Sequence, residues 1–170
     1  MTARRIIIIV LAALALVGAG LLAWKLFFPD EKARIIRTLD DAADAVAIDR
    51  NEPATALLIK TRRLEALLDD TVDVSLRANR EHFSGSPERR QIISMLATAR
   101  RSGIAVRGKL SDFSVVIDGD RAYVEAAASV WYRPRDGQEF TQQEDLNIEL
   151  VRRDGNWLIS KVAFRNFMEK

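Results

Sequence analysis

One alternating segment of the sequence carries polar side chains where they could do chemistry. Every second residue from position 140 to 150 forms one set, namely Phe140, Gln142, Glu144, Leu146, Ile148 and Leu150. Alternate side chains of a β-strand point to the same face of the sheet, and four of these six are apolar. We therefore expect this face to look toward the core, with Gln142 and Glu144 pointing inward near one end.

Glu144 at such a position has two interpretations. A buried carboxylate is costly unless it is paired or lies at a wet opening, so an inward Glu144 would belong to the polar lining of a pocket and could act there as an acid or base. Alternatively, a β-bulge or a shifted register returns Gln142 and Glu144 to solvent. The sequence leaves both open, and Glu144 is the candidate catalytic residue.

Large aromatic residues in the strand-like segments are candidates for a pocket wall. Trp131 and Tyr132 end one predicted strand, and Tyr123 and Trp157 lie in or near others. Core or edge packing is the ordinary role of such rings. The alternative is a ligand wall or a protein interface. We therefore add Trp131 and Tyr132 to Gln142 and Glu144 as candidate pocket residues.

His82 is the single histidine of the chain, and histidine is the side chain that ordinarily titrates near neutral pH. A catalytic histidine needs an orienting partner and a pocket. Its neighbour Glu81 does not establish such a geometry, and a lone histidine in a predicted loop is more often solvated. The absence of cysteine also excludes disulfides, zinc thiolates and a cysteine nucleophile. We expect no metal site and no cofactor.

The charge distribution argues against nucleic-acid binding. Of the 26 Lys and Arg residues, three (Arg4, Arg5 and Lys25) precede Asp30, where no acidic residue occurs. Residues 30–170 therefore carry 26 − 3 = 23 basic and 24 acidic side chains, a net charge of −1. A protein that neutralises many phosphates needs a basic surface. We expect no nucleic-acid partner.

These residues must be positioned by an α+β domain. Helical spacing of apolar residues predicts a helix over 31–50 and another from Pro53 to Leu68. Ser86, Pro87 and Glu88 predict the start of a third helix, which ends at Gly103. A short strand is expected at 72–77 and a loop at 79–85. Long strands joined by Gly-containing turns are expected at 106–117, 122–132, 140–152 and 157–167, which favours an antiparallel sheet.

An apolar segment precedes the domain. Residues 6–24 contain no charge, and Leu26, Phe27 and Phe28 extend the segment past Lys25. A helix of this length nearly spans a bilayer core of about 30 Å. Arg4 and Arg5 on its N-terminal side predict a cytoplasmic N-terminus. We therefore expect a stub and transmembrane helix over 1–29, embedded through residues 6–28, and an extracytoplasmic domain over 30–170.

A cleaved signal peptide is the alternative for this segment. Small residues at Val17-Gly18-Ala19 fit a cleavage site, but the apolar run continues beyond them. Both interpretations place residues 30–170 outside the cytoplasm. The retained anchor predicts a single-pass protein of the cytoplasmic membrane.

Two phrases of the sequence resemble a known superfamily. They are the hairpin over 115–124, with Asp118-Gly119-Asp120 at its turn, and the closing phrase over 150–159, with Asp154-Gly155-Asn156. Together with the order of elements over 31–167, they resemble the nuclear transport factor 2-like superfamily, also called SnoaL-like or cystatin-like. The resemblance implies three helices packed on a curved antiparallel sheet that forms a cone.

The resemblance leaves the function open, because this superfamily contains isomerases, dehydratases and non-catalytic assembly or binding domains. Its enzymes place an Asp, His or Tyr inside the cone, and no such constellation maps onto this sequence. We therefore expect an accessory or assembly domain of the bacterial cell envelope, which binds a protein partner or self-associates. The alternative is a binder or enzyme that acts on a small apolar ligand in the cone.

Overall fold

The computed structural model describes residues 30–50, 52–78 and 81–164. The chain divides into two compact units, Met1–Arg34 and Ile35–Lys170, and the second unit contains the α+β fold. The predicted anchor, residues 6–28, lies outside the described residues. In the part of the chain that the structure describes, no helix is both long and apolar enough to cross a membrane.

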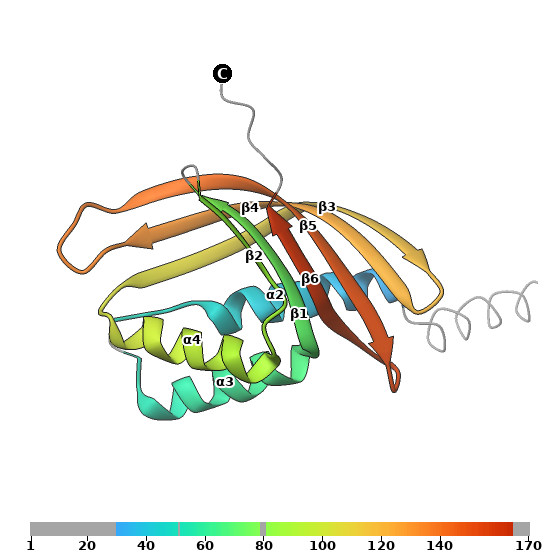
Figure 1. Ribbon diagram of the computed structural model, residues 1–170, viewed down its shortest axis with the longest axis horizontal. Coiled ribbons are helices and arrows are strands. Elements are labelled where there is room, and N and C mark those ends of the chain that lie inside the picture. Colours follow the sequence, from blue (N-terminus) through green and yellow to red (C-terminus); the bar gives the residue numbers. More distant parts are fainter. Residues whose placement is uncertain (1–29, 51, 79–80, 165–170) are drawn as a thin grey trace, which may run out of the picture. The chain divides into compact units, whose positions relative to one another are not determined.

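Three helices lie on one side of a curved sheet (Figure 1). They are α2 (Glu31–Val46), α3 (Ala54–Leu67) and α4 (Arg89–Arg101). Helix α2 buries Ile35, Leu39, Ala42 and Ala45, which share one side of the helix. The predicted end of this helix at position 50 is wrong, because Ile48 leaves the helix and pairs its backbone with Val106 as a short extension of the sheet.

Helix α4 begins two residues later than the sequence predicts. Its N-cap is Glu88, which forms a capping box with Gln91: each side chain binds the backbone N–H of the other residue. Ser86, the predicted cap, instead donates its hydroxyl hydrogen to the Asp73 carboxylate. The predicted C-terminal signal is confirmed, since Gly103 follows the C-cap Ser102 with a φ of +79°.

Six strands form a single sheet in the order β2-β1-β6-β5-β4-β3. The four long strands occur close to where the alternating pattern predicts them. The strands are β1 (Leu68–Ala78), β2 (Glu81–Gly85), β3 (Ala105–Asp118), β4 (Arg121–Arg133), β5 (Phe140–Arg153) and β6 (Asn156–Phe164).

The sheet is mixed, so the expected fully antiparallel sheet is wrong at one pair. Strand β1 runs parallel to β6, and all other neighbours are antiparallel. The predicted loop over 79–85 is also wrong, because residues 81–85 form β2 and pair with β1. Strand β1 also begins four residues earlier than expected. The polar residues at its start interrupt the alternating pattern, and they form strand structure because β6 lies beside them.

The core lies between α2 and the inner face of the sheet, the face that the helices cover. Ile35 and Leu39 of α2 pack in one cluster with Val124 of β4 and Leu150 of β5. A bulge between Ser111 and Ser114 of β3 changes which alternate residues reach this face. Burial of such side chains stabilises the fold by about 1.5–3 kcal/mol each, which makes this cluster the main support of the cone.

Candidate functional site

Exposure rises steadily along the inner face of β5. Leu150 at one end is fully buried, whereas Phe140 at the other end is 52% exposed. Between them, Leu146 is still buried, Glu144 is half-buried and Gln142 is exposed. All of them share one face by strand alternation, so the gradient means that the helices cover one end of the face and leave the other end open.

The partners of these residues on β4 follow the same gradient. Glu144 lies opposite Ala128, Gln142 opposite Val130, and Phe140 opposite Tyr132. Ala128 is buried, and Val130 and Tyr132 are half-buried. Residues opposite each other in an antiparallel pair share a face. The open end of the inner face is thus made of Gly108, Val130, Tyr132, Phe140, Gln142 and Glu144, and we call these six residues the open end.

Gly108 makes the open end hollow on its β3 side. It lies opposite Val130, in the middle of a strand whose neighbours on the same face, Val106 and Leu110, carry side chains. A Cβ atom built on Gly108 would meet no atom within 4 Å. The space that a side chain would fill at this point of the inner face is therefore vacant.

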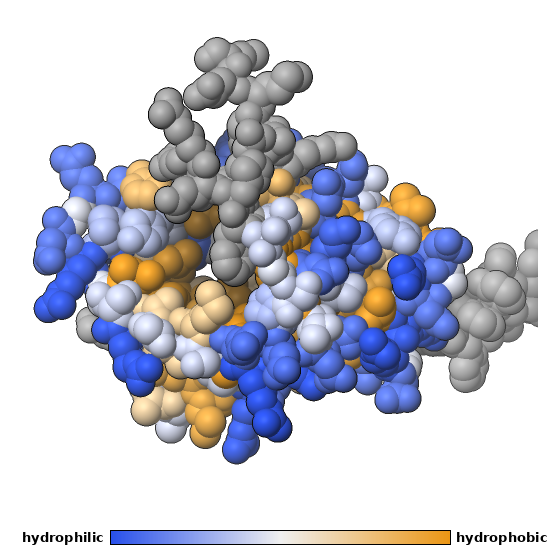
Figure 2. All heavy atoms as spheres, in the orientation of Figure 1, coloured by the Kyte–Doolittle hydropathy of each residue, from blue (hydrophilic) through white to orange (hydrophobic). Residues whose placement is uncertain are grey.

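The apolar side chains of helix α4 are also incompletely covered. It has no fully buried residue. Its apolar residues Ile92, Ile93 and Leu96 are half-buried and pack only at the margin of the core. In Figure 2, apolar side chains lie beside an opening between the layer of α4 and the sheet. An apolar surface that folding leaves partly uncovered is a feature of ligand sites.

The polar groups of the open end interact with each other. The Gln142 side-chain amide donates a hydrogen bond to the Glu144 carboxylate. Among the described residues, Glu144 forms no ion pair. One carboxylate oxygen therefore remains available as an acceptor, and the amide orients the carboxylate along the strand. Strand alternation places Gln142 and Glu144 on the inner face, with Glu144 half-buried and Gln142 exposed.

The two predicted pocket aromatics lie on opposite faces. Tyr132 packs against Phe140 with ring centroids 5.0 Å apart and forms an aromatic wall of the open end. Trp131 points to the outer face, where the guanidinium carbons of Arg107 and Arg133 lie 5.7 and 5.0 Å from its ring centroid. Adjacent residues of a strand cannot share a face, so Trp131 is not part of the open end.

The remaining candidates have other surroundings. The backbone of His82 pairs with Arg77 in the β1–β2 hairpin, and its side chain lies outside the described residues. Trp157 is buried in the core, whereas Tyr123 is 41% exposed on the outer face. Within the described ranges, no group of His, Asp and Glu side chains could hold a metal ion.

An ion pair between a buried carboxylate and a largely exposed arginine fixes the covered end of the sheet, and the sequence pattern did not predict it. Asp69 of β1 is 6% exposed, and Arg153 of β5 donates to both its oxygens, at 2.8 and 2.9 Å. Burial opposes ionisation of Asp69, but the hydrogen bonds from Arg153 and from the Asp70 backbone outweigh it and lower the pKa of Asp69. This pair is structural, because it lies away from the open end.

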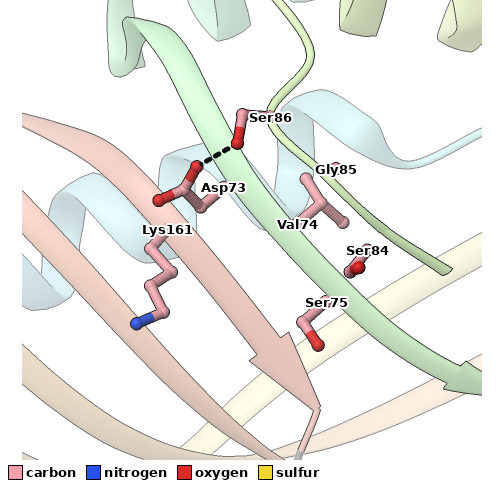
Figure 3. A pocket seen from close by; sticks show the side chains of 7 residues that line it. All are labelled: Asp73, Val74, Ser75, Ser84, Gly85, Ser86 and Lys161. Carbon is pink, nitrogen blue, oxygen red and sulfur yellow. Dashed lines mark hydrogen bonds between the residues drawn. The ribbon is translucent and has the colours of Figure 1, made fainter. Parts of the chain in front are cut away.

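The outer face of the sheet also carries hollows. One of about 720 Å³ is lined by Trp131 and Thr141 together with Lys60 and Arg63 of α3. Another, of about 340 Å³, lies over β1, β2 and β6 and is lined by Asp73, Ser75, Ser84 and Lys161 (Figure 3). The Lys161 ammonium lies 2.7 Å from Glu149, which raises the pKa of Lys161. This pairing neutralises the lysine, so the smaller hollow has no strong attraction for an anion.

A curved sheet over helices, with a covered core and an open apolar end, defines the class of small α+β cone domains. Residues 63–163 match the model of the SnoaL-like domain, and the chain belongs to this family. No curated protein matches the chain in sequence.

Solved structures share the fold. A candidate scytalone dehydratase from Novosphingobium aromaticivorans is 17% identical, with a TM-score of 0.62, over 81% of this chain and 85% of that one. The Kfla4162 protein of Kribbella flavida is 18% identical, with a TM-score of 0.64, over 78% and 88%. A dehydratase candidate of the nuclear transport factor 2-like family from Streptomyces avermitilis is 13% identical, with a TM-score of 0.60, over 81% and 97%. At these identities the likeness establishes the fold alone.

Proposed function

We propose that this protein binds a small, largely apolar molecule in the open end of its cone. The observation that carries the proposal is the exposure gradient of the inner face, from fully buried Leu150 to half-exposed Phe140. This face stays mostly apolar where its cover ends, and burial of that surface by a ligand is favourable.

The polar groups of the open end favour binding over catalysis. Among the described residues they are the Tyr132 hydroxyl and the Gln142–Glu144 pair, whereas a general base normally needs an orienting partner and a reacting atom held nearby. The fold itself is compatible with either role, since two of the similar solved structures are dehydratase candidates.

Gly108→Leu tests the proposal, because its side chain would enter the vacant space. Glycine inside a strand is destabilising by roughly 0.5–1 kcal/mol relative to alanine, so the free energy of unfolding should stay constant or rise. Binding of the neutral fluorophore N-phenyl-1-naphthylamine to the full-length chain should be saturable in the original protein and lost in the variant. Fluorescence titration and thermal unfolding measure the two effects.

Gln143→Leu is the matched control for this variant. Gln143 is exposed on the outer face of β5, opposite Ser129, so the same leucine there adds apolar surface without entering the cone. This variant should bind the fluorophore like the original protein. Binding that survives Gly108→Leu, or an original protein that gives no saturable signal, would contradict the proposal.

We also propose that residues 6–28 anchor the domain in the cytoplasmic membrane, with residues 30–170 outside the cytoplasm. The uncharged stretch over 6–24 and the basic residues Arg4 and Arg5 support it. In that setting a protein partner or a second copy could contact the outer face of the sheet, where Val116 and Tyr123 are 61% and 41% exposed. This accessory role is the second candidate function.

A further inference from the structure

Among the described residues, no cationic side chain pairs with Glu144, although most other interactions of carboxylates in this part of the chain involve Arg or Lys. Its neighbours on the inner face are Gln142 and Leu146 along β5 and Ala128 across on β4, all uncharged. A half-buried carboxylate against apolar neighbours lacks compensation, which makes a cation its most favourable partner.

The aromatic wall of the open end suits the apolar body of such a cation. Tyr132 and Phe140 lie four pairs along the β4–β5 ladder from the Ala128–Glu144 pair, on the same face and roughly 13 Å away. Their rings are in contact, with centroids 5.0 Å apart. An ammonium at Glu144 is therefore beyond the reach of about 6 Å that a cation–π contact allows. The rings instead offer an apolar surface to the body of a ligand whose ammonium lies at Glu144.

We propose that the ligand of the open end is an organic cation, that is, an amine carried on an apolar body. The ammonium donates a hydrogen bond to Glu144, which Gln142 holds in place, and the apolar body covers Val130 and the space beside Gly108. Carboxylates of the same size are rejected by the charge of Glu144. This inference rests on the proposed ligand-binding function and names its substrate class.

Three probes with one naphthyl body test it on the full-length chain. They are 2-(1-naphthyl)ethylamine, a cation; 2-(1-naphthyl)ethanol, which is neutral; and 1-naphthylacetate, an anion. Each competes with N-phenyl-1-naphthylamine in fluorescence titrations at neutral pH. We expect the amine to bind about 10-fold more tightly than the alcohol, the lower end of the effect of a charged hydrogen bond, and the acid to bind most weakly.

Two variants test whether the Glu144 carboxylate causes the preference for the amine over the alcohol. In Glu144→Gln the ratio between amine and alcohol should fall to about one. Asp145→Asn is the matched control, because Asp145 is the next residue on β5 and is exposed on the opposite face. This variant removes the same charge from the strand and should keep the preference.

The outcomes separate the two proposals. If the alcohol binds but the amine has no advantage in the original protein, ligand binding stands and the choice of an organic cation is overturned. A preference that survives Glu144→Gln, or that Asp145→Asn also abolishes, overturns the assignment to Glu144. If neither the alcohol nor the fluorophore binds, the ligand-binding function itself fails. The comparison of the three probes needs no variant, so it does not depend on the folding of one.

Discussion

At the scale of single residues, Asp69 shows how a charged side chain is kept in the core. Only 6% of this residue is exposed, although carboxylates ordinarily stay at the surface. Arg153 approaches it with two guanidinium nitrogens, each bound to a different carboxylate oxygen. Such bidentate pairs are stronger and more directional than single contacts. The pair also joins β1 to β5 across β6, so one interaction ties three strands.

We predict that Asp69→Asn lowers the free energy of unfolding by about 1–2 kcal/mol at pH 7, because a charged hydrogen-bond pair is lost and Arg153 is partly solvated. The lowered pKa of Asp69 sets the pH dependence. Its contribution is complete above the usual aspartate pKa of about 3.9 and disappears as the pH falls through the lower folded value. Urea unfolding at pH 7 and in acid measures the difference between the two proteins.

Asp70→Asn is the control for that prediction. Asp70 also binds an arginine, Arg89, at 2.5 Å, but 83% of its side chain is exposed. Exposed ion pairs contribute little, so its loss should change stability by about 0.5 kcal/mol or less. Equal effects of the two substitutions would show that burial of Asp69 does not matter.

At the scale of elements, Arg100 holds the three helices together. Its guanidinium donates to the Thr61 hydroxyl of α3 at 2.9 Å and to the Ala45 carbonyl of α2 at 2.8 Å. That carbonyl belongs to the last turn of α2, where backbone acceptors lack helical donors and positive charge is favourable. In the sequence, Arg100 and Arg101 look like a pair of solvated arginines. In the structure, Arg100 instead connects the helices.

We predict that Arg100→Met, which keeps the length of the apolar stem, lowers the free energy of unfolding by about 1–3 kcal/mol. Amide hydrogen exchange should increase in α4 more than in the sheet. Arg101→Met provides the comparison, since Arg101 is exposed and its nitrogen lies 3.5 Å from Thr98 of its own helix. If both variants lose the same stability in urea, the link between helices is unimportant.

The sequence predicted elements best where one repeating pattern decides them. The alternation that identifies β4, β5 and β6 reflects one buried and one solvated face, which any half-buried strand must have. In β3 the alternation is interrupted, because Leu110 and Val115 both face inward across a bulge in which Asp112 has a φ of +55°. Strand β2 was missed because its identity depends on β1 beside it.

The open end was predicted only in part for a similar reason. Strand alternation placed Gln142 and Glu144 inward, because a two-residue period is local. The same alternation places Trp131 and Tyr132, which are adjacent in the chain, on opposite faces, so the prediction that both line one pocket is wrong. Gly108 could not be recognised, since vacant space around a glycine depends on the positions of α4 and β4. A hollow between elements depends on how those elements pack against each other, and the sequence of one segment does not determine that packing.

At the scale of the whole molecule, the proposed location predicts a topology. We expect alkaline phosphatase fused after Lys170 to be active in intact cells, because Arg4 and Arg5 hold the N-terminus in the cytoplasm against the single Lys25. A green fluorescent protein fused at the same position, which fluoresces only when it folds in the cytoplasm, should be dark. The reverse pattern of the two reporters would refute the proposed topology.

The last strand of the chain lies in the middle of the sheet. Strand β6 separates the β2–β1 hairpin from the β5–β4–β3 meander, and it pairs with a partner on each side. During synthesis, the two halves of the sheet cannot join until residues 156–164 have left the ribosome. Until then each half presents an unpaired edge to other chains. A chain that stops before position 156 should therefore aggregate rather than fold as a smaller cone, because only β6 joins the two halves of the described sheet.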